Sequence, residues 1–121
     1  MARVLIVDDS AEYTALFQSG LEALGREVTT AANRLEALDA LAMKRFDVIF
    51  LDVVMRGGGA ITLVHEVREI DRTTPIVVIS GVPEVLLSPV FTAGMAQAQA
   101  KLRKSATLTE INQLISRLTE I

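Results

Sequence analysis

The sequence predicts an α/β fold in which a parallel β-sheet is covered by helices on both faces. Segments with the pattern of strands alternate with segments with the pattern of helices along the 121 residues, which is typical of βα units joined by right-handed crossovers. Residues 48–51 form an unbroken apolar run, partly β-branched and partly aromatic, as expected of a strand buried on both faces. The length is that of one domain, so we expect residues 1–121 to form a single domain.

The first part of the chain predicts two βα units. Residues 3–7 form a short apolar strand, and Ser10 can cap the following helix, which Gly25 ends. The apolar stripe of this helix is expected to contain Tyr13, Leu16, Phe17, Leu21, Ala23 and Leu24. Residues 27–30 form a more polar strand, which we place near an edge of the sheet. A helix over residues 34–44 follows, because Asn33 and Glu36 resemble a capping box. Its inward side chains are expected to be Leu35, Ala37, Leu38, Leu41 and Ala42.

The central strand is followed by the remaining units. A helix is expected over about residues 60–70, and Pro75 precedes a fourth apolar strand at 76–79. The inward residues of the helix are expected to be Ile61, Val64, Val67 and Ile70. A further helix is expected within residues 86–93, and a fifth strand over 98–102. The last helix begins at a capping box formed by Thr107 and Glu110, with Leu108, Ile111, Leu114, Ile115 and Leu118 at helical spacing.

The resulting order βαβαβαβαβα predicts a flavodoxin-like (βα)5 three-layer sandwich. Its five-stranded parallel sheet has the order 2-1-3-4-5, which places the first and third strands side by side. The first strand is followed by Asp8 and Asp9, and Asp52 is expected just past the third strand. We therefore expect these three carboxylates to converge at the carboxyl edge of the sheet, where ligands of open α/β sheets bind.

Three carboxylates in one cleft repel each other, and a divalent cation relieves that repulsion. An oxygen-only site of this kind suits Mg²⁺, which prefers one or two carboxylates with water and phosphate oxygens. With a phosphoryl donor bound, Asp52 can act as an in-line nucleophile. Ser80, at the end of the fourth strand, can donate a hydrogen bond to a phosphoryl oxygen, and a lysine after the fifth strand can pair with another.

Composition excludes several other classes of protein. The net charge of -3 argues against a general nucleic-acid-binding surface. Because the chain has no cysteine, it has no disulfide framework and no thiolate metal site. No segment approaches the roughly 18 consecutive apolar residues of a membrane span, and the first residues do not resemble a signal peptide. We expect a cytoplasmic protein that contacts neither nucleic acid nor membrane directly.

Four motifs together resemble the receiver domain of two-component response regulators. They are Val-Asp-Asp-Ser at 7–10, Leu-Asp-Val-Val-Met at 51–55, Val-Ile-Ser-Gly at 78–81 and Leu-Arg-Lys at 102–104. The resemblance covers the whole chain, and its motifs are specific in combination rather than singly. It implies one receiver domain over residues 1–121, without an output domain in this chain.

The resemblance also implies site roles and partners. It assigns Asp8, Asp9, Asp52 and the backbone carbonyl of Val54 to Mg²⁺, Asp52 to phosphorylation, Ser80 to the switch hydroxyl and Lys104 to the phosphate-pairing lysine. The expected donor is a histidine kinase or phosphotransfer protein, and the expected output passes to a partner through the face of helix four, strand five and helix five. The domain would catalyse its own phosphorylation and dephosphorylation, and would not act as an enzyme on a separate substrate.

Several positions depart from the family pattern and leave alternatives open. Ser105 replaces the proline that usually follows the lysine, and Lys101 competes with Lys104 for the phosphate-pairing role. These departures favour a pseudo-receiver, a constitutive protein-binding module, as the alternative function. The third hypothesis is a small hydrolase that turns over an aspartyl-phosphate intermediate, but such enzymes usually have a second acid two residues after the nucleophile, where this chain has Val54. His65, next to apolar residues of the third helix, is interpreted as a surface or boundary residue.

Overall fold

The computed structural model describes residues 2–53, 60–81 and 98–119. The elements in chain order are β1 (Arg3–Val7), α1 (Ala11–Ala23), β2 (Glu27–Ala31), α2 (Arg34–Met43), β3 (Val48–Asp52), α3 (Ala60–Ile70), β4 (Ile76–Ser80), β5 (Ala100–Arg103) and α5 (Leu108–Thr119). The helix predicted within residues 86–93 and the carbonyl of Val54 lie outside the described residues. Within the described part of the chain, no helix has the length and apolar character needed to cross a membrane.

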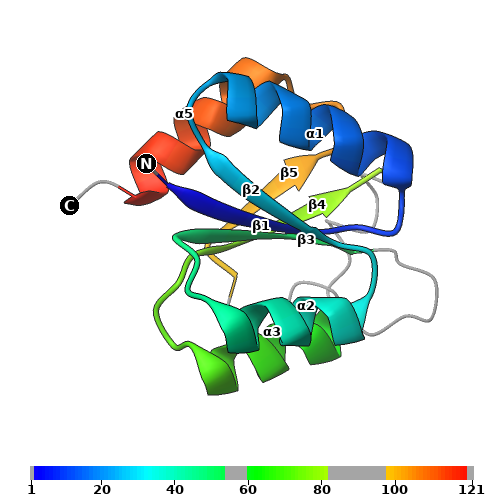
Figure 1. The fold of residues 1–121 in the computed structure, drawn as a ribbon, viewed down its shortest axis with the longest axis vertical. Coiled ribbons are helices and arrows are strands. Elements are labelled where there is room, and N and C mark those ends of the chain that lie inside the picture. Colours follow the sequence, from blue (N-terminus) through cyan, green and yellow to red (C-terminus); the bar gives the residue numbers. More distant parts are fainter. Residues whose placement is uncertain (1, 54–59, 82–97, 120–121) are drawn as a thin grey trace.

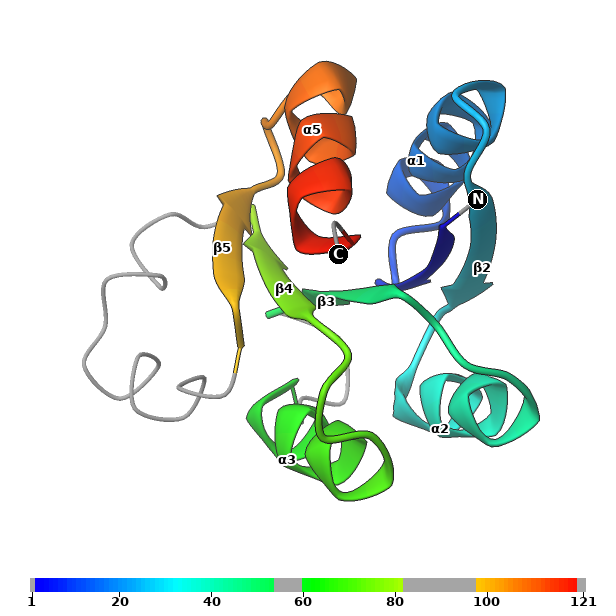
Figure 2. The same cartoon turned by 90° about the vertical axis from the view of Figure 1, so that its left-hand side faces the viewer.

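The five strands form one parallel sheet in the order β2-β1-β3-β4-β5, which confirms the predicted flavodoxin-like fold. Helices α1 and α5 cover one face of this sheet, and α2 and α3 cover the other, as seen in Figures 1 and 2. Strand β2 lies at one edge, as its polar sequence predicts. Because helices cover both faces, the inner strands of the described part of the chain end at the two rims of the sheet (Figure 1).

Successive strand residues point to opposite faces of the sheet, so β1, β3 and β4 each contribute to two apolar clusters. Toward α2 and α3, the buried cluster includes Leu5, Ile49, Leu51, Val64, Val67 and Val78. Toward α1 and α5, it includes Val4, Ile6, Phe17, Leu21, Phe50, Ile79, Ile111 and Ile115. Fully burying one such side chain contributes about 1.5–3 kcal/mol. Strands β1, β3 and β4, at whose ends Asp8, Asp52 and Ser80 lie, are thus buried along almost their whole length.

The three predicted N-terminal caps of helices are present. The side chains of Ser10, Asn33 and Thr107 accept hydrogen bonds from the backbone N–H groups of Tyr13, Glu36 and Glu110 at 3.3, 2.9 and 3.1 Å. Glu110 completes a capping box by accepting from the Thr107 N–H at 3.1 Å, whereas Glu36 accepts from the N–H of Ala32 at 2.9 Å. Each cap satisfies backbone donors that the helix itself leaves unpaired.

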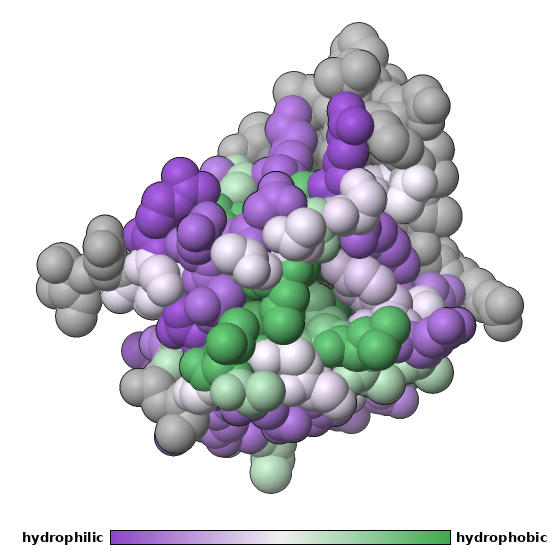
Figure 3. Space-filling view, turned by 90° about the horizontal axis from the view of Figure 1, so that it is seen from above, coloured by the Kyte–Doolittle hydropathy of each residue, from purple (hydrophilic) through white to green (hydrophobic). Residues whose placement is uncertain are grey.

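The predicted inward faces of the helices were partly wrong. The residues that were expected inside but are exposed are Leu16, Ala23, Leu24, Leu35, Ala42, Ile70 and Leu108. Successive helical residues are about 100° apart around the axis, so not every apolar residue of a helix can reach the sheet. The buried residues of α1 are Thr14, Phe17 and Leu21. Large apolar side chains, among them Leu16 of α1 and Leu108 of α5, remain exposed, and Figure 3 shows apolar residues on this face of the molecule.

The last strand differs from its predicted position. It was expected over residues 98–102, but β5 covers Ala100–Arg103, where Ala100 and Leu102 pack against the core and Lys101 is exposed. Hydrogen bonding to β4 continues one residue beyond the strand, from the N–H of Lys104 to the carbonyl of Ser80 at 2.9 Å. The shift makes Lys104 the first residue after β5, at the carboxyl edge of the sheet.

Candidate functional site

Three carboxylates converge at the carboxyl edge, where β1 and β3 end side by side. The register pairs Val7 of β1 with Leu51 of β3, so Asp8 and Asp52 both follow directly. One carboxylate oxygen from each of Asp8, Asp9 and Asp52 lies within 4.8 Å of the others. Asp8 and Asp52 are only 2% and 3% exposed. Asp52, predicted to lie just past the strand, is instead its last residue.

Asp8 is oriented by hydrogen bonds of both its backbone and its side chain. Its N–H donates to the carbonyl of Ala31, the last residue of β2, at 3.0 Å. Its Oδ1 accepts a hydrogen bond from the N–H of Ser10 at 2.8 Å. Because Ser10 also caps α1, the start of that helix and the carboxylate are held together. The second oxygen, Oδ2, is thereby directed toward Lys104.

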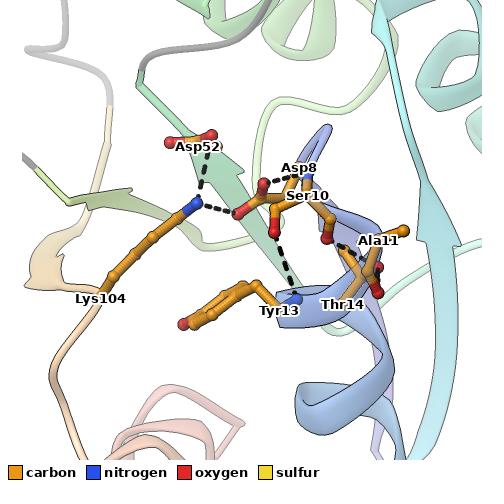
Figure 4. Close-up of polar contacts among 7 residues, drawn as sticks. All are labelled: Asp8, Ser10, Ala11, Tyr13, Thr14, Asp52 and Lys104. Carbon is orange, nitrogen blue, oxygen red and sulfur yellow. Dashed lines mark hydrogen bonds and ion pairs between the residues drawn. The ribbon is translucent and has the colours of Figure 1, made fainter.

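Lys104 extends from the end of β5 to both buried carboxylates, as Figure 4 shows. Its Nζ lies 2.8 Å from Oδ2 of Asp8 and 3.5 Å from Oδ2 of Asp52. The backbone turn after β5 is closed by a hydrogen bond from the N–H of Ala106 to the carbonyl of Arg103 at 3.0 Å. With Ser105 in this turn, the lysine still reaches the carboxylates. The alternative, Lys101, is exposed and lies within β5 rather than after its end, which favours Lys104 for the phosphate-pairing role.

The electrostatics of the cluster favour an additional cation. Burial acts to lower the pKa of Lys104, but the close contact with Asp8 and the charges of Asp52 and Asp8 outweigh it, so the pKa lies above its usual value. One ammonium facing three carboxylates leaves negative charge that is partly withdrawn from water, which is costly without a counter-ion. Hard carboxylate oxygens at this spacing are the donors that Mg²⁺ prefers, so Asp8, Asp9 and Asp52 fit the predicted metal.

Ser80 is the last residue of β4 and is fully buried. Its strand pairs with β3 so that Ile79 lies opposite Asp52, and the Val53 N–H donates to the carbonyl of Ile79 at 2.9 Å. The hydroxyl residue therefore belongs to the same carboxyl edge as the cluster, as predicted. His65, predicted at the surface, is exposed on α3.

Sequence reasoning overlooked Tyr13 as a member of this site. It was assigned to the apolar stripe of the first helix, yet its ring lies next to Lys104, with Nζ 4.8 Å from the ring centroid (Figure 4). Burial and the charges of Asp8 and Asp52 raise the pKa of Tyr13 to about 12. One signal was available in the sequence: Tyr13 lies in the first turn of a helix that starts at the carboxyl edge.

Comparisons with known proteins agree with this geometry. A family model for the response regulator receiver domain matches residues 4–116. The transcriptional regulatory protein PrrA of Mycobacterium tuberculosis is 31% identical over 130 residues, covering 94% of this chain and 56% of PrrA. The chemotaxis protein CheY4 of Vibrio cholerae, solved at low pH, is 32% identical, with a TM-score of 0.86 and 98% of each chain covered.

A more distant structure shows the shared fold alone. The response regulator TrrA of Thermotoga maritima, solved with Mg²⁺ and BeF, has a TM-score of 0.85 at 24% identity, and covers 98% of this chain and 99% of its own. The chain spans about half of the length of the curated relatives it matches. The family match extends over nearly all of the present sequence, with the acidic residues at the expected strand ends. The chain therefore belongs to the response regulator receiver domain family.

Proposed function

We propose that Asp52 accepts a phosphoryl group from a histidine kinase or phosphotransfer protein, with Mg²⁺ bound, and that this modification switches a protein-binding surface. One observation carries the proposal. The carboxylates of Asp8, Asp9 and Asp52 lie within 4.8 Å of one another, and Lys104 contacts two of them. A cluster with this charge is costly for a purely structural element and suits metal-dependent phosphoryl transfer.

The residues proposed to hold Mg²⁺ are Asp8, Asp9, Asp52 and the backbone carbonyl of Val54, the last outside the described part of the chain. When bound, the metal would neutralise charge on the phosphoryl oxygens. Asp8 is held by the N–H of Ser10, so its free rotation is restricted before any metal arrives. Few protein ligands are offered, and we therefore expect weak binding of Mg²⁺.

The proposed transfer is an in-line displacement at phosphorus. A carboxylate oxygen of Asp52 forms a bond to phosphorus while the bond from phosphorus to the donor imidazole nitrogen breaks, and the electron pair leaves with that nitrogen. Lys104, already 3.5 Å from Asp52, would pair with a phosphoryl oxygen. Ser80 would donate its hydroxyl hydrogen to another. The domain thus promotes a reaction on itself, and later loss of the group to water, without processing a separate substrate.

The proposed output passes through the face made by β5, α5 and the fourth helix, which the sequence predicts within residues 86–93. We expect Ser80 and the residues that follow to move toward the phosphoryl group. Lys101 is exposed on β5, and burying its ammonium would be costly, so it should remain outside when the surface changes. The proposed partner is a protein that binds this face, without direct contact of this domain with nucleic acid or membrane. A cytoplasmic location fits a histidine-kinase donor.

Intact mass after incubation with acetyl phosphate and Mg²⁺ tests the proposal. Wild type should gain one phosphoryl adduct, and Asp52→Asn should gain none, because the substitution removes the nucleophile and keeps the shape. A matched control is Asp47→Asn, at the opposite end of the same strand, where the carboxylate accepts from the N–H of Arg3 at 2.7 Å. Asp47→Asn should label like wild type.

Each other result has a definite meaning. Equal labelling of Asp52→Asn and wild type would assign the acceptor role to another residue. A wild-type protein that stays unlabelled while binding partners would support the pseudo-receiver. Release of phosphate with continuing turnover would instead support a hydrolase that forms an aspartyl-phosphate intermediate.

A further inference from the structure

The aromatic ring of Tyr13 lies against the ammonium of Lys104, which also contacts the carboxylates of Asp8 and Asp52 (Figure 4). Nζ of Lys104 is 4.8 Å from the ring centroid and 2.8 Å from Oδ2 of Asp8. A cation within about 6 Å of a ring centroid is attracted by the negative face of the ring, and more so when water is excluded. The Lys104 side chain is only 24% exposed, so this contact is largely shielded from water.

The ring is itself held firmly by the core. Its centroid lies 6.0 Å from that of Phe17, one turn further along α1, and Phe17 packs edge-on against Phe50 of β3 at 5.1 Å. The first turn of α1 is also tied to Ser10, which caps the helix and donates its N–H to Asp8. Tyr13 therefore connects the lysine to the same rigid elements that hold the carboxylates.

The hydroxyl group of Tyr13 does not explain why this side chain lies next to Lys104. Oη is buried and has no hydrogen-bond partner within the described ranges of the chain. Burying an unpaired hydroxyl is unfavourable, so this group adds nothing to holding Lys104 there. The face of the ring is the part of the side chain that interacts with the ammonium, and phenylalanine should supply the same face.

We propose that Tyr13 is a positioning residue for Lys104, and that its ring keeps the ammonium over Asp8 and Asp52 ready for an incoming phosphoryl group. The kinetic part of this inference rests on the proposed function. Lysine has a flexible four-carbon stem, and holding it in one place before the reaction lowers the entropic cost of the transfer. Ser105 replaces the proline that usually follows this lysine. The ring of Tyr13 contacts Lys104 from α1, a different element from the turn that carries the lysine.

The chain offers a direct spectroscopic test, because Lys44, Lys101 and Lys104 are its only lysines. In protein labelled with ¹³C-lysine, the ε-methylene signal of Lys104 should be shifted upfield by the ring current, and Lys104→Arg would assign it. Exposed Lys101 is the internal reference. Tyr13→Phe should leave the Lys104 signal in place, and Tyr13→Leu should move it toward that of Lys101. Tyr13→Met serves as the second variant if the leucine form does not fold.

Phe46→Leu is the matched control, since Phe46 lies 6.0 Å from Nζ of Lys44 and packs in the other apolar cluster. It should move only the Lys44 signal, although it disturbs the core. Labelling by acetyl phosphate with Mg²⁺ is the second readout. Tyr13→Leu should be slower on the order of fivefold, as expected from losing one cation–π contact, whereas Tyr13→Phe and Phe46→Leu should stay within about twofold of wild type.

The two readouts separate the inference from the proposed function. An unlabelled wild type would contradict the proposed function, and the Lys104 signal would still decide whether Tyr13 positions the lysine. An unmoved Lys104 signal in folded Tyr13→Leu would overturn the inference. A moved signal with an unchanged labelling rate would overturn the claim that positioning assists the transfer. If Phe46→Leu and Tyr13→Leu slow phosphoryl labelling equally, the slowing comes from a general loss of stability, and the claim that Tyr13 assists the transfer is overturned.

Discussion

Asp71 closes the turn between α3 and β4 with both of its carboxylate oxygens. Oδ1 accepts hydrogen bonds from the N–H groups of Thr73 and Thr74, each at 3.0 Å, and Oδ2 accepts from the Thr74 hydroxyl. Burial acts to raise the pKa of Asp71, but the hydrogen bonds from Thr74 and Thr73 outweigh it and lower the pKa to about 2. This single carboxylate therefore links the end of one helix to the start of the strand that carries Ser80.

The lowered pKa predicts a specific loss of stability in acid. The folded pKa of about 2 lies below the ordinary 3.8, so the contribution is present above pH 3.8 and is lost as the pH falls toward 2. Asp71→Ala should lower the free energy of unfolding by about 1–2 kcal/mol at neutral pH, through the lost hydrogen bonds. Its stability should also fall less steeply in acid. Urea unfolding at several pH values measures both effects.

Asp71→Asn separates the charge from the hydrogen bonds. It keeps one side-chain oxygen to accept from Thr73 and Thr74, and it cannot titrate. Its stability at neutral pH should lie between those of wild type and Asp71→Ala. If all three proteins lose stability in parallel in acid, the acid sensitivity arises elsewhere.

At the scale of elements, α1 and α5 approach each other closely where Gly20 of α1 faces Leu108 of α5. A Cβ atom added at Gly20 would lie 2.7 and 2.9 Å from the Cδ atoms of Leu108, which is closer than such atoms approach. Leu108 is at the start of α5 and is 37% exposed, so its side chain can move aside at some cost. Glycine within a helix is itself less favourable than alanine by about 1 kcal/mol, and this close approach explains why it is present.

The helix propensity of residue 20 and its contact with Leu108 together predict that substitutions at Gly20 and Leu108 are coupled. Gly20→Ala alone should change the free energy of unfolding little, because the gain in helix propensity is offset by the displaced Leu108. In a Leu108→Ala background, the same substitution should stabilise the protein by about 1 kcal/mol. Thermal or urea unfolding of the four proteins in this cycle gives the coupling. Equal effects of Gly20→Ala in both backgrounds would show that the two helices do not meet there.

The helices and strands themselves were predicted more accurately from the sequence than the side of each helix that is buried. Capping residues act locally, and Ser10, Asn33 and Thr107 could be identified from their neighbours alone. Burial depends on how a helix is rotated against the sheet, which hydropathy alone does not determine. Leu16 was expected inside but is 70% exposed. Thr14 is buried instead, and its hydroxyl is satisfied by the carbonyls of Ser10 and Ala11.

At the scale of the whole molecule, the strand order assembles the site. The order β2-β1-β3-β4-β5 places the ends of β1, β3, β4 and β5 at one rim, so residues far apart in the sequence meet there. The positions of Asp8, Asp9, Asp52 and Ser80 followed from this order and could be predicted. The choice between Lys101 and Lys104 depended on where a weak strand ends, and the contact of Tyr13 with Lys104 depended on three-dimensional packing.

The carboxylate cluster predicts that Mg²⁺ stabilises the folded protein. A ligand that binds only the folded state raises the melting temperature with its concentration. The melting temperature of wild type should therefore increase with added Mg²⁺, and Asp9→Asn should lose most of this response. Glu36→Gln is a nearby control, since Glu36 lines the same 230 Å³ pocket as Asp8 and Asp9 but is outside the cluster. A wild-type melting temperature that ignores Mg²⁺ would contradict the metal assignment.

The central claim is that Asp52 carries the phosphoryl group, and locating that group chemically tests it most directly. Borohydride reduces an acyl phosphate to an alcohol, so a phosphorylated aspartate becomes homoserine, which tandem mass spectrometry of peptides can place in the sequence. After incubation with acetyl phosphate, we predict homoserine at position 52 when Mg²⁺ is present, and little or none when it is removed by a chelator. Homoserine at Asp8, Asp9 or another position, or none in wild type with donor and Mg²⁺ present, would contradict the account.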